Sequence, residues 1–416
     1  MHEKLLINNP KLVFNSEFRC LIYLLDLIRG NTSRGQFTGM IMLDLQKAFD
    51  TVNHDILCEK LKAMGVMSTE WFSSYLSYRK QVVSINNECS NFMSISCGVP
   101  QGSILGPVLF LCYVNDMQIS IDSDCQLLLY ADDSVILFSH KNPEIISQKL
   151  GIQLESCSKW LVDNKLSLHL GKTECMLFGP QRKLHQYQDF SISCNGTNIK
   201  AVHSVKYLGL QIDNMLSGES IVMSIIGKVN ARLKFLYRHK KHLDFKCRQL
   251  LSSALIQCYF DYACSSWYAG LTKTLKNKLQ VTQNKVVRFI LNLEQRASVN
   301  NNVLERANML CVSDRVKQLR LNHVYNIVHG TAPQYMLNNF THISQTHMHN
   351  TRASRYNFMQ PPIKGKEDGS FFINAIKDWN SLPDNVKGQM TKVNFKISLK
   401  SHLFNDAKSR FMNNYV

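Results

Sequence analysis

Leu127-Leu128-Leu129-Tyr130-Ala131-Asp132-Asp133-Ser134-Val135-Ile136-Leu137-Phe138 is the stretch that decides the fold. It consists of two apolar runs separated by Ala131-Asp132-Asp133, a pattern that predicts a β-hairpin with two acids at its tip. Ionised carboxylates beside apolar strands are costly unless they are paired, hydrogen-bonded or bound to a cation. Aspartate is also a common turn former, so one such hairpin would mean little by itself.

A third acid stands in the same kind of setting. Asp44 lies in the apolar run Met40-Ile41-Met42-Leu43-Asp44-Leu45, which predicts a buried strand. A glycine-containing loop, residues 98–102, separates this run from the hairpin in the sequence. Clustered acids without a neighbouring basic residue favour a hard divalent cation with oxygen ligands, above all Mg²⁺.

The rest of the first half mixes helices and strands. Strands are expected at residues 81–86, 92–97 and 175–178, and helices at 17–29, 56–64, 71–76, 108–117 and 145–161. Trp71 and Phe72 are expected in the core rather than as a platform for stacked bases. Beyond about residue 213 the pattern becomes mainly helical, as in 221–237 and 248–259. This order predicts an α/β or α+β sheet domain followed by a helical region.

The excess of positive charge lies entirely in the second half of the chain. Residues 1–213 hold 19 Lys and Arg against 20 Asp and Glu, a balance of −1, whereas residues 214–416 hold 29 against 11, a balance of +18. The two balances add up to the net charge of +17. A basic half joined to a neutral one is typical of a module that binds a polyanion, although a merely solvated basic surface is the simpler alternative.

The cysteines and the apolar runs of the sequence indicate the cellular compartment of the protein. The 13 cysteines are scattered and never spaced as Cys-x-x-Cys, which favours free thiols in a reduced, intracellular environment. The longest apolar run near the start, 21–25, is far too short to cross a bilayer, and no secretory signal opens the chain. We therefore expect no membrane partner.

Five segments, in order and spacing, resemble the motifs of a known family. They are Leu43–Asp50 (motif A), Cys97–Pro107 (motif B), Tyr130–Asp133 (motif C), Asn164–Thr173 (motif D) and Lys206–Gly209 (motif E). Any one short match is weak, but together they resemble the reverse transcriptases of LINE-type, non-LTR retrotransposons. Residues 283–290 and 379–383 are similar to C-terminal signatures of the jockey-like branch.

This resemblance implies an α+β fold: a right-hand polymerase palm, meaning a mixed sheet with a catalytic hairpin, followed by a mainly helical basic thumb and C-terminal region. The expected domains are a poorly matched remnant leader (1–36), the palm with partial fingers (37–213), a basic thumb and connector (214–295), and a helical C-terminal region of unknown role (296–416). The implied activity is that of an RNA-directed DNA polymerase, acting on template RNA, a DNA primer and deoxynucleoside triphosphates.

The resemblance also assigns the carboxylates. Asp44 and Asp132 would hold two Mg²⁺ ions, with the Leu45 carbonyl as a further ligand and Mn²⁺ as an alternative ion. Asp133 would support the charge and geometry of the site. In sites of this kind the two ions lie about 3.5–4 Å apart, and one activates the primer 3′-hydroxyl while the other stabilises the leaving pyrophosphate.

The resemblance implies four residues that bind the incoming nucleotide. Phe49 matches a steric gate that excludes the ribose 2′-hydroxyl, although without the motif a core aromatic would be the better reading. Gln101 and Gly102 match the loop that approaches the incoming nucleotide, where glycine permits close backbone contact. Lys172 matches a lysine that protonates or neutralises pyrophosphate, whereas an isolated surface lysine would carry no such meaning.

The resemblance also implies which residues contact the primer and its duplex. Tyr207, Leu208 and Gly209 match the primer grip. Residues 228–248 contain eight Lys and Arg and one acid, Asp244, which suits a thumb that grips phosphates as well as it suits a solvated basic helix.

The sequence also departs from the family. Only 43 residues precede Asp44, so the resemblance implies an N-terminally truncated copy without complete fingers or an endonuclease. The alternative function is a catalytically inactive remnant that at most binds nucleic acid. No zinc is expected, because His342, His347 and His349 have no cysteine at ligand spacing. A working copy would act in the nucleus.

Overall fold

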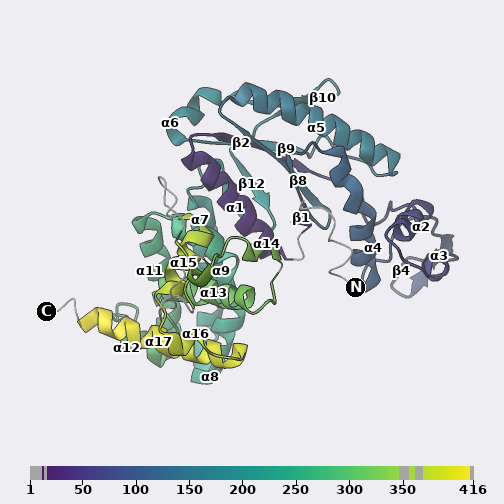
Figure 1. Cartoon of the computed structure of the whole chain (residues 1–416). Helices are drawn as coiled ribbons and strands as arrows, with labels where there is room; N and C mark the ends of the chain where they lie inside the picture. Colours follow the sequence, from purple (N-terminus) through teal and green to yellow (C-terminus); the bar gives the residue numbers. More distant parts are fainter. Residues whose placement is uncertain (1–11, 14–15, 333, 346–355, 361–368, 413–416) are drawn as a thin grey trace. The chain divides into compact units, whose positions relative to one another are not determined.

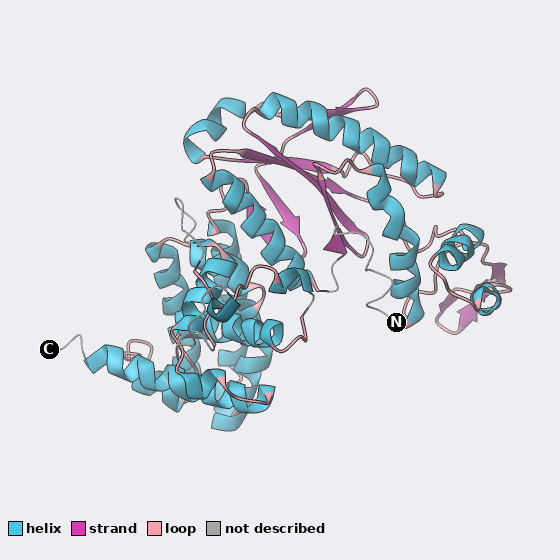
Figure 2. Cartoon of the chain, viewed as in Figure 1, coloured by secondary structure: helices cyan, strands magenta, loops and turns pink. Residues whose placement is uncertain are grey.

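The apolar runs around Asp44 and Asp132 form the centre of a five-stranded sheet with the order β1-β7-β8-β2-β9 (Figure 2). The computed structural model describes residues 12–13, 16–332, 334–345, 356–360 and 369–412. The strands of this sheet are β1 (Leu12–Val13), β2 (Phe37–Leu43), β7 (Gln126–Tyr130), β8 (Asp133–His140) and β9 (Glu174–Phe178). The predicted central hairpin and its neighbouring strands are confirmed.

Strand β2 lies in the middle of the antiparallel part of the sheet. It pairs with β8 on one side, from Phe37 opposite His140 to Leu43 opposite Ser134, and with β9 on the other side. Six of its seven residues are buried, so both faces of the strand are covered. This explains why the sequence of β2 is a continuous apolar run rather than an alternation.

Helix α5 (Pro143–Asp163) covers one face of this sheet (Figure 1). Ile146 and Leu150, four residues apart, are fully buried on its inner side. A Cβ atom at Gly39 of β2 would lie only 2.3 Å from Ile146 Cγ2 and 2.6 Å from Leu150 Cδ1. Glycine at this position therefore allows the helix to pack directly on the backbone of the central strand.

The remaining elements of this region are short. The helices are α2 (His54–Ala63), α3 (Thr69–Leu76), α4 (Leu105–Val114), η2 (Asn115–Ser120), α6 (Gln181–Leu184) and η3 (His185–Tyr187). Three small two-stranded sheets pair β3 (Lys80–Gln81) with β6 (Met93–Ser94), β4 (Ser84–Ile85) with β5 (Glu88–Cys89), and β10 (Ser191–Cys194) with β11 (Thr197–Lys200).

Two expectations in this region need correction. The predicted strands 81–86 and 92–97 pair only in two-residue pieces, because the residues of these pieces are exposed and no core face sustains a longer ladder. The predicted core position of Trp71 is wrong: the residue is 54% exposed and stacks on Tyr75. Phe72 packs against the core as expected.

The chain divides into two compact units, and α1 (Glu17–Ser33) contributes to both. The first unit comprises residues 1–20 and 35–208, and the second comprises 21–34 and 209–416. Leu21, Ile22 and Leu24 are fully buried. The helix predicted at 17–29 is confirmed, and it is a core element of the fold.

The second unit is helical, as predicted beyond residue 213. Its elements after the short β12 (Ser204–Tyr207) and β13 (Leu210–Asp213) sheet are α7 (Glu219–Arg238), η4 (Lys240–His242), α8 (Phe245–Ser252), the π-helical η5 (Ser253–Gln257), α9 (Cys258–Asp261), α10 (Cys264–Trp267), η6 (Tyr268–Gly270), α11 (Lys273–Leu291), α12 (Asn301–Arg306), α13 (Val312–Val328), α14 (Gln334–Leu337), η7 (Ile343–Gln345), α15 (Phe371–Asn380), α16 (Asp384–Lys387) and α17 (Lys392–Met412). The single helix predicted at 248–259 is interrupted by the π turn.

Two further expectations concern the whole chain. All 13 cysteines are free thiols, as the absence of a disulfide-like spacing predicted. Within the described ranges, none of the helices has the length and apolar character needed to traverse a bilayer.

Candidate active site

The three candidate carboxylates occur at one end of the β2–β8 pair. Because Leu43 lies opposite Ser134, the register brings Asp44 and Asp133, the next residues at this end, alongside each other. Asp132 lies in the two-residue turn that joins β7 to β8. The antiparallel register thus brings together acids that are far apart in the sequence. A register shifted by one residue would not bring them together.

The turn itself is strained. Ala131, its first residue, has φ of 51°, in the left-handed region that residues with a Cβ rarely adopt. For an L residue this conformation costs roughly 1–2 kcal/mol. Strain of this kind persists where the surrounding structure imposes it, and here the long β7–β8 ladder does so.

Asp133 lies in a field of negative charge. Its pKa is raised above the ordinary value, first by burial of the carboxyl group and then by the charges of Asp132, Asp44 and Glu17. Every charge that contributes to this shift is negative. Glu17, in the first turn of α1, lies outside the five motifs, and nothing in the sequence marked it as a neighbour of the site.

The backbone around Leu45 is held by motif D. Leu45 forms an isolated antiparallel bridge with Leu168, in which the Gln46 amide donates to the Ser167 carbonyl (2.8 Å) and the His169 amide donates to the Asp44 carbonyl (2.8 Å). Neither bond uses the Leu45 carbonyl. Motif D is thereby tied to motif A by backbone hydrogen bonds, which hold the chain around Asp44 in place.

The donor chemistry fits magnesium or manganese. Carboxylate and backbone carbonyl oxygens are the ligands that such hard cations prefer. In the described residues, no group of three or more His, Cys, Asp or Glu side chains is already gathered at metal-binding distance. Asp132 and Asp133 are exposed, so their side chains can rotate toward a cation that would relieve their mutual repulsion.

The motif B loop is fastened to motif A. Gln101 Nε2 donates to Asp50 Oδ1 (2.8 Å), and the Val99 amide donates to the Phe49 carbonyl (2.8 Å). A Cβ atom at Gly98, where φ is 90°, would lie 2.7 Å from the Asp50 carbonyl oxygen, so only glycine fits there. Asp50 is thus a positioning residue that the sequence analysis did not single out.

The candidate nucleotide residues differ in their surroundings. Gly102 has φ of 78° and open space around it, so a ligand can approach its backbone closely. Phe49 is half-buried and packs on Phe110, with the ring centroids 4.5 Å apart. Phe49 therefore packs against the core, as expected of a core aromatic residue. Its backbone carbonyl also accepts the hydrogen bond from the motif B loop.

Lys172 is exposed in the turn near the end of motif D. Its amide donates to the His169 carbonyl (2.9 Å), and His169 in turn donates to the Asp44 carbonyl. Lys172 is therefore three residues from His169, whose amide is hydrogen-bonded to the backbone of Asp44. No side-chain partner of Lys172 is present within the described residues.

The candidate primer grip is a tight turn. Leu208 and Gly209 both have positive φ, 44° and 74°, between β12 and β13. Tyr207 is buried, and its hydroxyl lies 3.3 Å from Cys20 Sγ. Burial raises the pKa of Tyr207, and the charge of Asp133 raises it further, which places this side chain within electrostatic reach of the carboxylates.

The three histidines that the sequence analysis set aside as zinc ligands lie in the C-terminal part of the chain. His342 forms a bridge with Phe358 and lies against its ring. Burial lowers its pKa. His347 and His349 lie outside the described residues.

Comparison with known proteins decides the family. The sequence model described as reverse transcriptase (RNA-dependent DNA polymerase) matches residues 7–212, which include motifs A to E. The chain belongs to the reverse transcriptases. The expected α+β fold with a palm that carries the catalytic hairpin is thereby confirmed, and the match extends into the segment 1–36.

Curated relatives of this reverse transcriptase come from non-LTR retrotransposons. The probable RNA-directed DNA polymerase from transposon X-element of Drosophila melanogaster is 23% identical over 336 residues, 79% of this chain and 34% of that protein. The RNA-directed DNA polymerase from mobile element jockey of Drosophila melanogaster is 28% identical over 261 residues, 60% of this chain and 28% of that protein. The chain thus spans about a third of the length of these relatives.

Among solved structures, telomerase from Candida tropicalis with a fragment of telomeric RNA is similar to this reverse transcriptase with a TM-score of 0.38 and 11% sequence identity. The alignment covers 74% of this chain and 53% of the telomerase chain. A similarity of this size supports no functional conclusion.

Proposed function

We propose that this chain is the catalytic part of an RNA-directed DNA polymerase that extends a primer 3′-hydroxyl with deoxynucleotides. One observation carries the proposal: the β2–β8 register sets Asp44 beside Asp133, next to the turn that holds Asp132. All the charges acting on Asp133 are negative, which is the arrangement that two-metal phosphoryl transfer needs. Positioning and charge neutralisation supply most of the catalysis in such reactions.

Each part of the site has a distinct task. Asp44, Asp132 and the Leu45 carbonyl would hold two Mg²⁺ or Mn²⁺ ions, which supply activation of the primer hydroxyl and stabilisation of the pyrophosphate. Asp133 maintains the negative field. Lys172 neutralises the departing pyrophosphate.

The motif B loop and the primer grip position the substrates. Gln101, held by Asp50, and the open backbone of Gly102 face the incoming deoxynucleotide, and Phe49 restricts the space for a ribose 2′-hydroxyl. Tyr207, Leu208 and Gly209 support the primer end. The tight turn at Leu208 limits the freedom of this support.

Helix α7 supplies a surface for the nucleic-acid backbone. Its buried side consists of Ile221, Val222, Ile225, Val229, Leu233 and Leu236. Its exposed side carries Lys228, Arg232, Lys234 and Arg238. Template RNA and primer DNA are polyanions, and a row of exposed cations contacts their phosphates without reading sequence.

The test is primer extension on an RNA template with Mg²⁺ and deoxynucleotides. The Asp132→Ala/Asp133→Ala double variant should lose at least about a thousandfold in rate, because it removes the charge that holds the metals. Asp189→Ala, which changes an exposed acid in a turn far from motifs A and C in sequence, is the matched control and should keep the wild-type rate.

A folded wild type that binds RNA but never extends the primer would sink the polymerase proposal. The basic second half would then be the functional part, as in the nucleic-acid-binding alternative. Equal rates for the wild type and the double variant would show that the observed activity comes from a contaminant and not from these carboxylates.

A further inference from the structure

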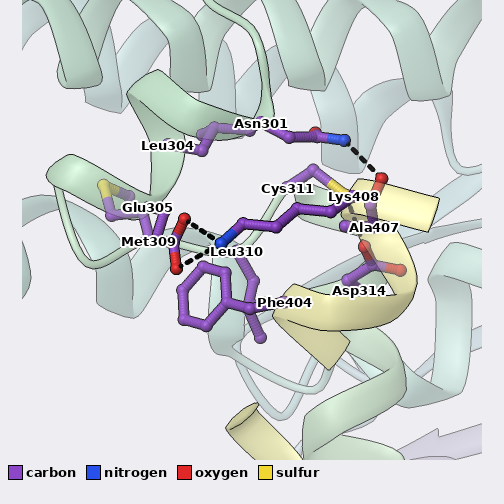
Figure 3. A pocket seen from close by; sticks show the side chains of 10 residues that line it. All are labelled: Asn301, Leu304, Glu305, Met309, Leu310, Cys311, Asp314, Phe404, Ala407 and Lys408. Carbon is purple, nitrogen blue, oxygen red and sulfur yellow. Dashed lines mark hydrogen bonds and ion pairs between the residues drawn. The ribbon is translucent and has the colours of Figure 1, made fainter. Parts of the chain in front are cut away.

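The helical unit contains a polar cavity that is not part of the proposed polymerase site. Its volume is about 360 Å³, and residues of α8, η5, α13 and α17 line it. Pockets for small ligands begin at roughly 300 Å³, so a nucleotide-sized molecule can enter. By contrast, the cavity beneath α17 in Figure 3 holds only about 10 Å³ and is crossed by the Lys408–Glu305 ion pair.

Positive side chains reach the larger cavity from three helices: Lys246 from α8, Arg315 from α13 and Lys400 from α17. The pKa of Lys400 is lowered, first by burial and then by the positive charge of Arg315. These two cations are therefore close enough to repel each other. An anion seated between them would relieve this repulsion, and phosphate is an anion that lysine and arginine bind well.

Other groups of the protein satisfy the charges and hydrogen-bond donors of Arg315 and Lys400 only in part. Arg315 donates to both carboxylate oxygens of Asp261, at 3.0 and 2.6 Å, so its charge is largely compensated. Lys400 donates to Asn308, to the side-chain oxygen at 2.7 Å and the backbone carbonyl at 3.3 Å. A lysine has three donors, so one hydrogen of Lys400 remains for a ligand.

The lining of the same cavity also includes polar groups that lack partners. Ser252 is 1% exposed, and its Oγ has no hydrogen-bond partner within the described residues; the same is true of Gln257 Oε1. Buried polar atoms without partners are rare in folded proteins. Ser252 directly precedes the π-helical turn Ser253–Gln257 and Gln257 is its last residue, and π turns occur frequently at functional sites.

We propose that this cavity binds one nucleotide, with its phosphate at Lys400 and Lys246 and its sugar or base at Ser252 and Gln257. The chemistry is the same for a free nucleotide and for a nucleotide of an RNA strand that turns into the cavity. The site lies within the second unit and is separate from the residues assigned to the incoming deoxynucleotide.

The proposal is tested on the full chain by fluorescence anisotropy with a labelled 12-nucleotide RNA, and by calorimetry with adenosine 5′-monophosphate and with inorganic phosphate. Lys400→Gln should weaken nucleotide binding on the order of tenfold, the loss expected for one charge-assisted hydrogen bond. Lys396→Gln removes the same charge one turn earlier on α17, at an exposed residue that does not line the cavity. It should change binding less than about twofold, because Lys396 does not contact the ligand and its exposed charge acts only through water and salt, which weaken it.

Ser252→Ala separates the polar residues proposed to bind the sugar or base from the lysines proposed to bind the phosphate. It removes a hydroxyl that has no partner in the protein, so the fold should be retained, and it should weaken binding of the nucleotide while leaving binding of inorganic phosphate unchanged. Binding of adenosine monophosphate identifies a site for the free nucleotide, and binding of the RNA alone identifies a site for a strand.

Either of two results would overturn the proposal. Equal losses from Lys400→Gln and Lys396→Gln would show a diffuse electrostatic effect. Equal affinities for phosphate and for both nucleotide ligands, unaffected by Ser252→Ala, would reduce the cavity to an anion site without nucleotide recognition.

Discussion

Two groups of acids in this molecule have opposite surroundings. In the helical unit four buried or half-buried acids face an arginine: Asp26 with Arg29 (3.6 Å), Asp261 with Arg315 (2.6 Å), Asp378 with Arg320 (2.7 Å) and Asp314 with Arg410 (2.7 Å). At the β2–β8 end of the sheet, the charges that act on Asp133 are those of other acids.

The difference separates acids that hold the fold together from acids kept for a ligand. An acid with an arginine partner gains hydrogen bonds that offset the cost of burial. Acids that face one another are destabilising until a cation joins them, and such local costs are typical of functional sites. Four predictions test this contrast.

The largest effect is expected from breaking an arginine pair in the helical unit. Arg320 and Asp378 are largely buried, with side-chain exposures of 7% and 19%. Arg320→Leu leaves Asp378 buried without its partner and should lower the free energy of unfolding by about 3–5 kcal/mol. Urea unfolding followed by circular dichroism measures this change. Arg306→Leu, at an exposed position on α12, is the control, and equal losses in the two variants would contradict the contrast.

The second prediction concerns the cation that Asp44 and Asp132 are proposed to bind. At a magnesium concentration a hundredfold above its dissociation constant, a bound ion stabilises the fold by about 2.7 kcal/mol. Mg²⁺ should therefore raise the melting temperature of the wild type but not of the Asp44→Asn/Asp132→Asn variant. Differential scanning calorimetry provides the measurement. The same rise in both proteins would place magnesium binding elsewhere.

The third prediction compares two glycines of motif B. Gly98→Ala forces a Cβ atom to within 2.7 Å of the Asp50 carbonyl oxygen at a φ of 90°, and it should cost about 2 kcal/mol or more. Gly102→Ala meets no neighbouring atom, so only its φ of 78° opposes it, and it should cost roughly 1 kcal/mol. Thermal unfolding of the two variants ranks them. The reverse order would show that the loop is not fastened to Asp50.

The smallest effect is a dependence on pH. The pKa of Asp133 is raised in the folded chain, so the folded state binds a proton more readily than the unfolded state. Without metal, the contribution of Asp133 to stability should fall as the pH rises through this raised pKa. Asp133→Asn should then be more stable than the wild type near neutral pH, by less than about 1 kcal/mol because solvent screens an exposed side chain.

Stability curves of both proteins between pH 3 and pH 8 would measure this dependence. The advantage of Asp133→Asn should vanish as the pH falls below the ordinary aspartate range of about 4. An advantage that persists at acid pH would mean that repulsion between carboxylates is not its source.

Much of the fold could be predicted from local sequence, and the failures have a physical cause. The hairpin around Asp132 was predicted from two short apolar runs on either side of a polar turn, and helix α5 from apolar residues at helical spacing, because both patterns show which residues are buried. Trp71 was placed wrongly because an aromatic residue on an amphipathic segment looks the same whether its side is covered or open. The π turn inside 248–259 leaves no signal in the apolar pattern.

The amino-acid sequence by itself determined the family, the three carboxylates and the split between a neutral and a basic half, because these depend on residue type, order and short spacing. Only the tertiary structure showed Glu17 beside the carboxylates, Asp50 holding Gln101, and the arginine partners of four acids in the helical unit. The Asp26 carboxylate, for example, accepts hydrogen bonds from the backbone of Phe371 and Phe372. Contacts across such separations arise from packing and leave no periodicity in the sequence.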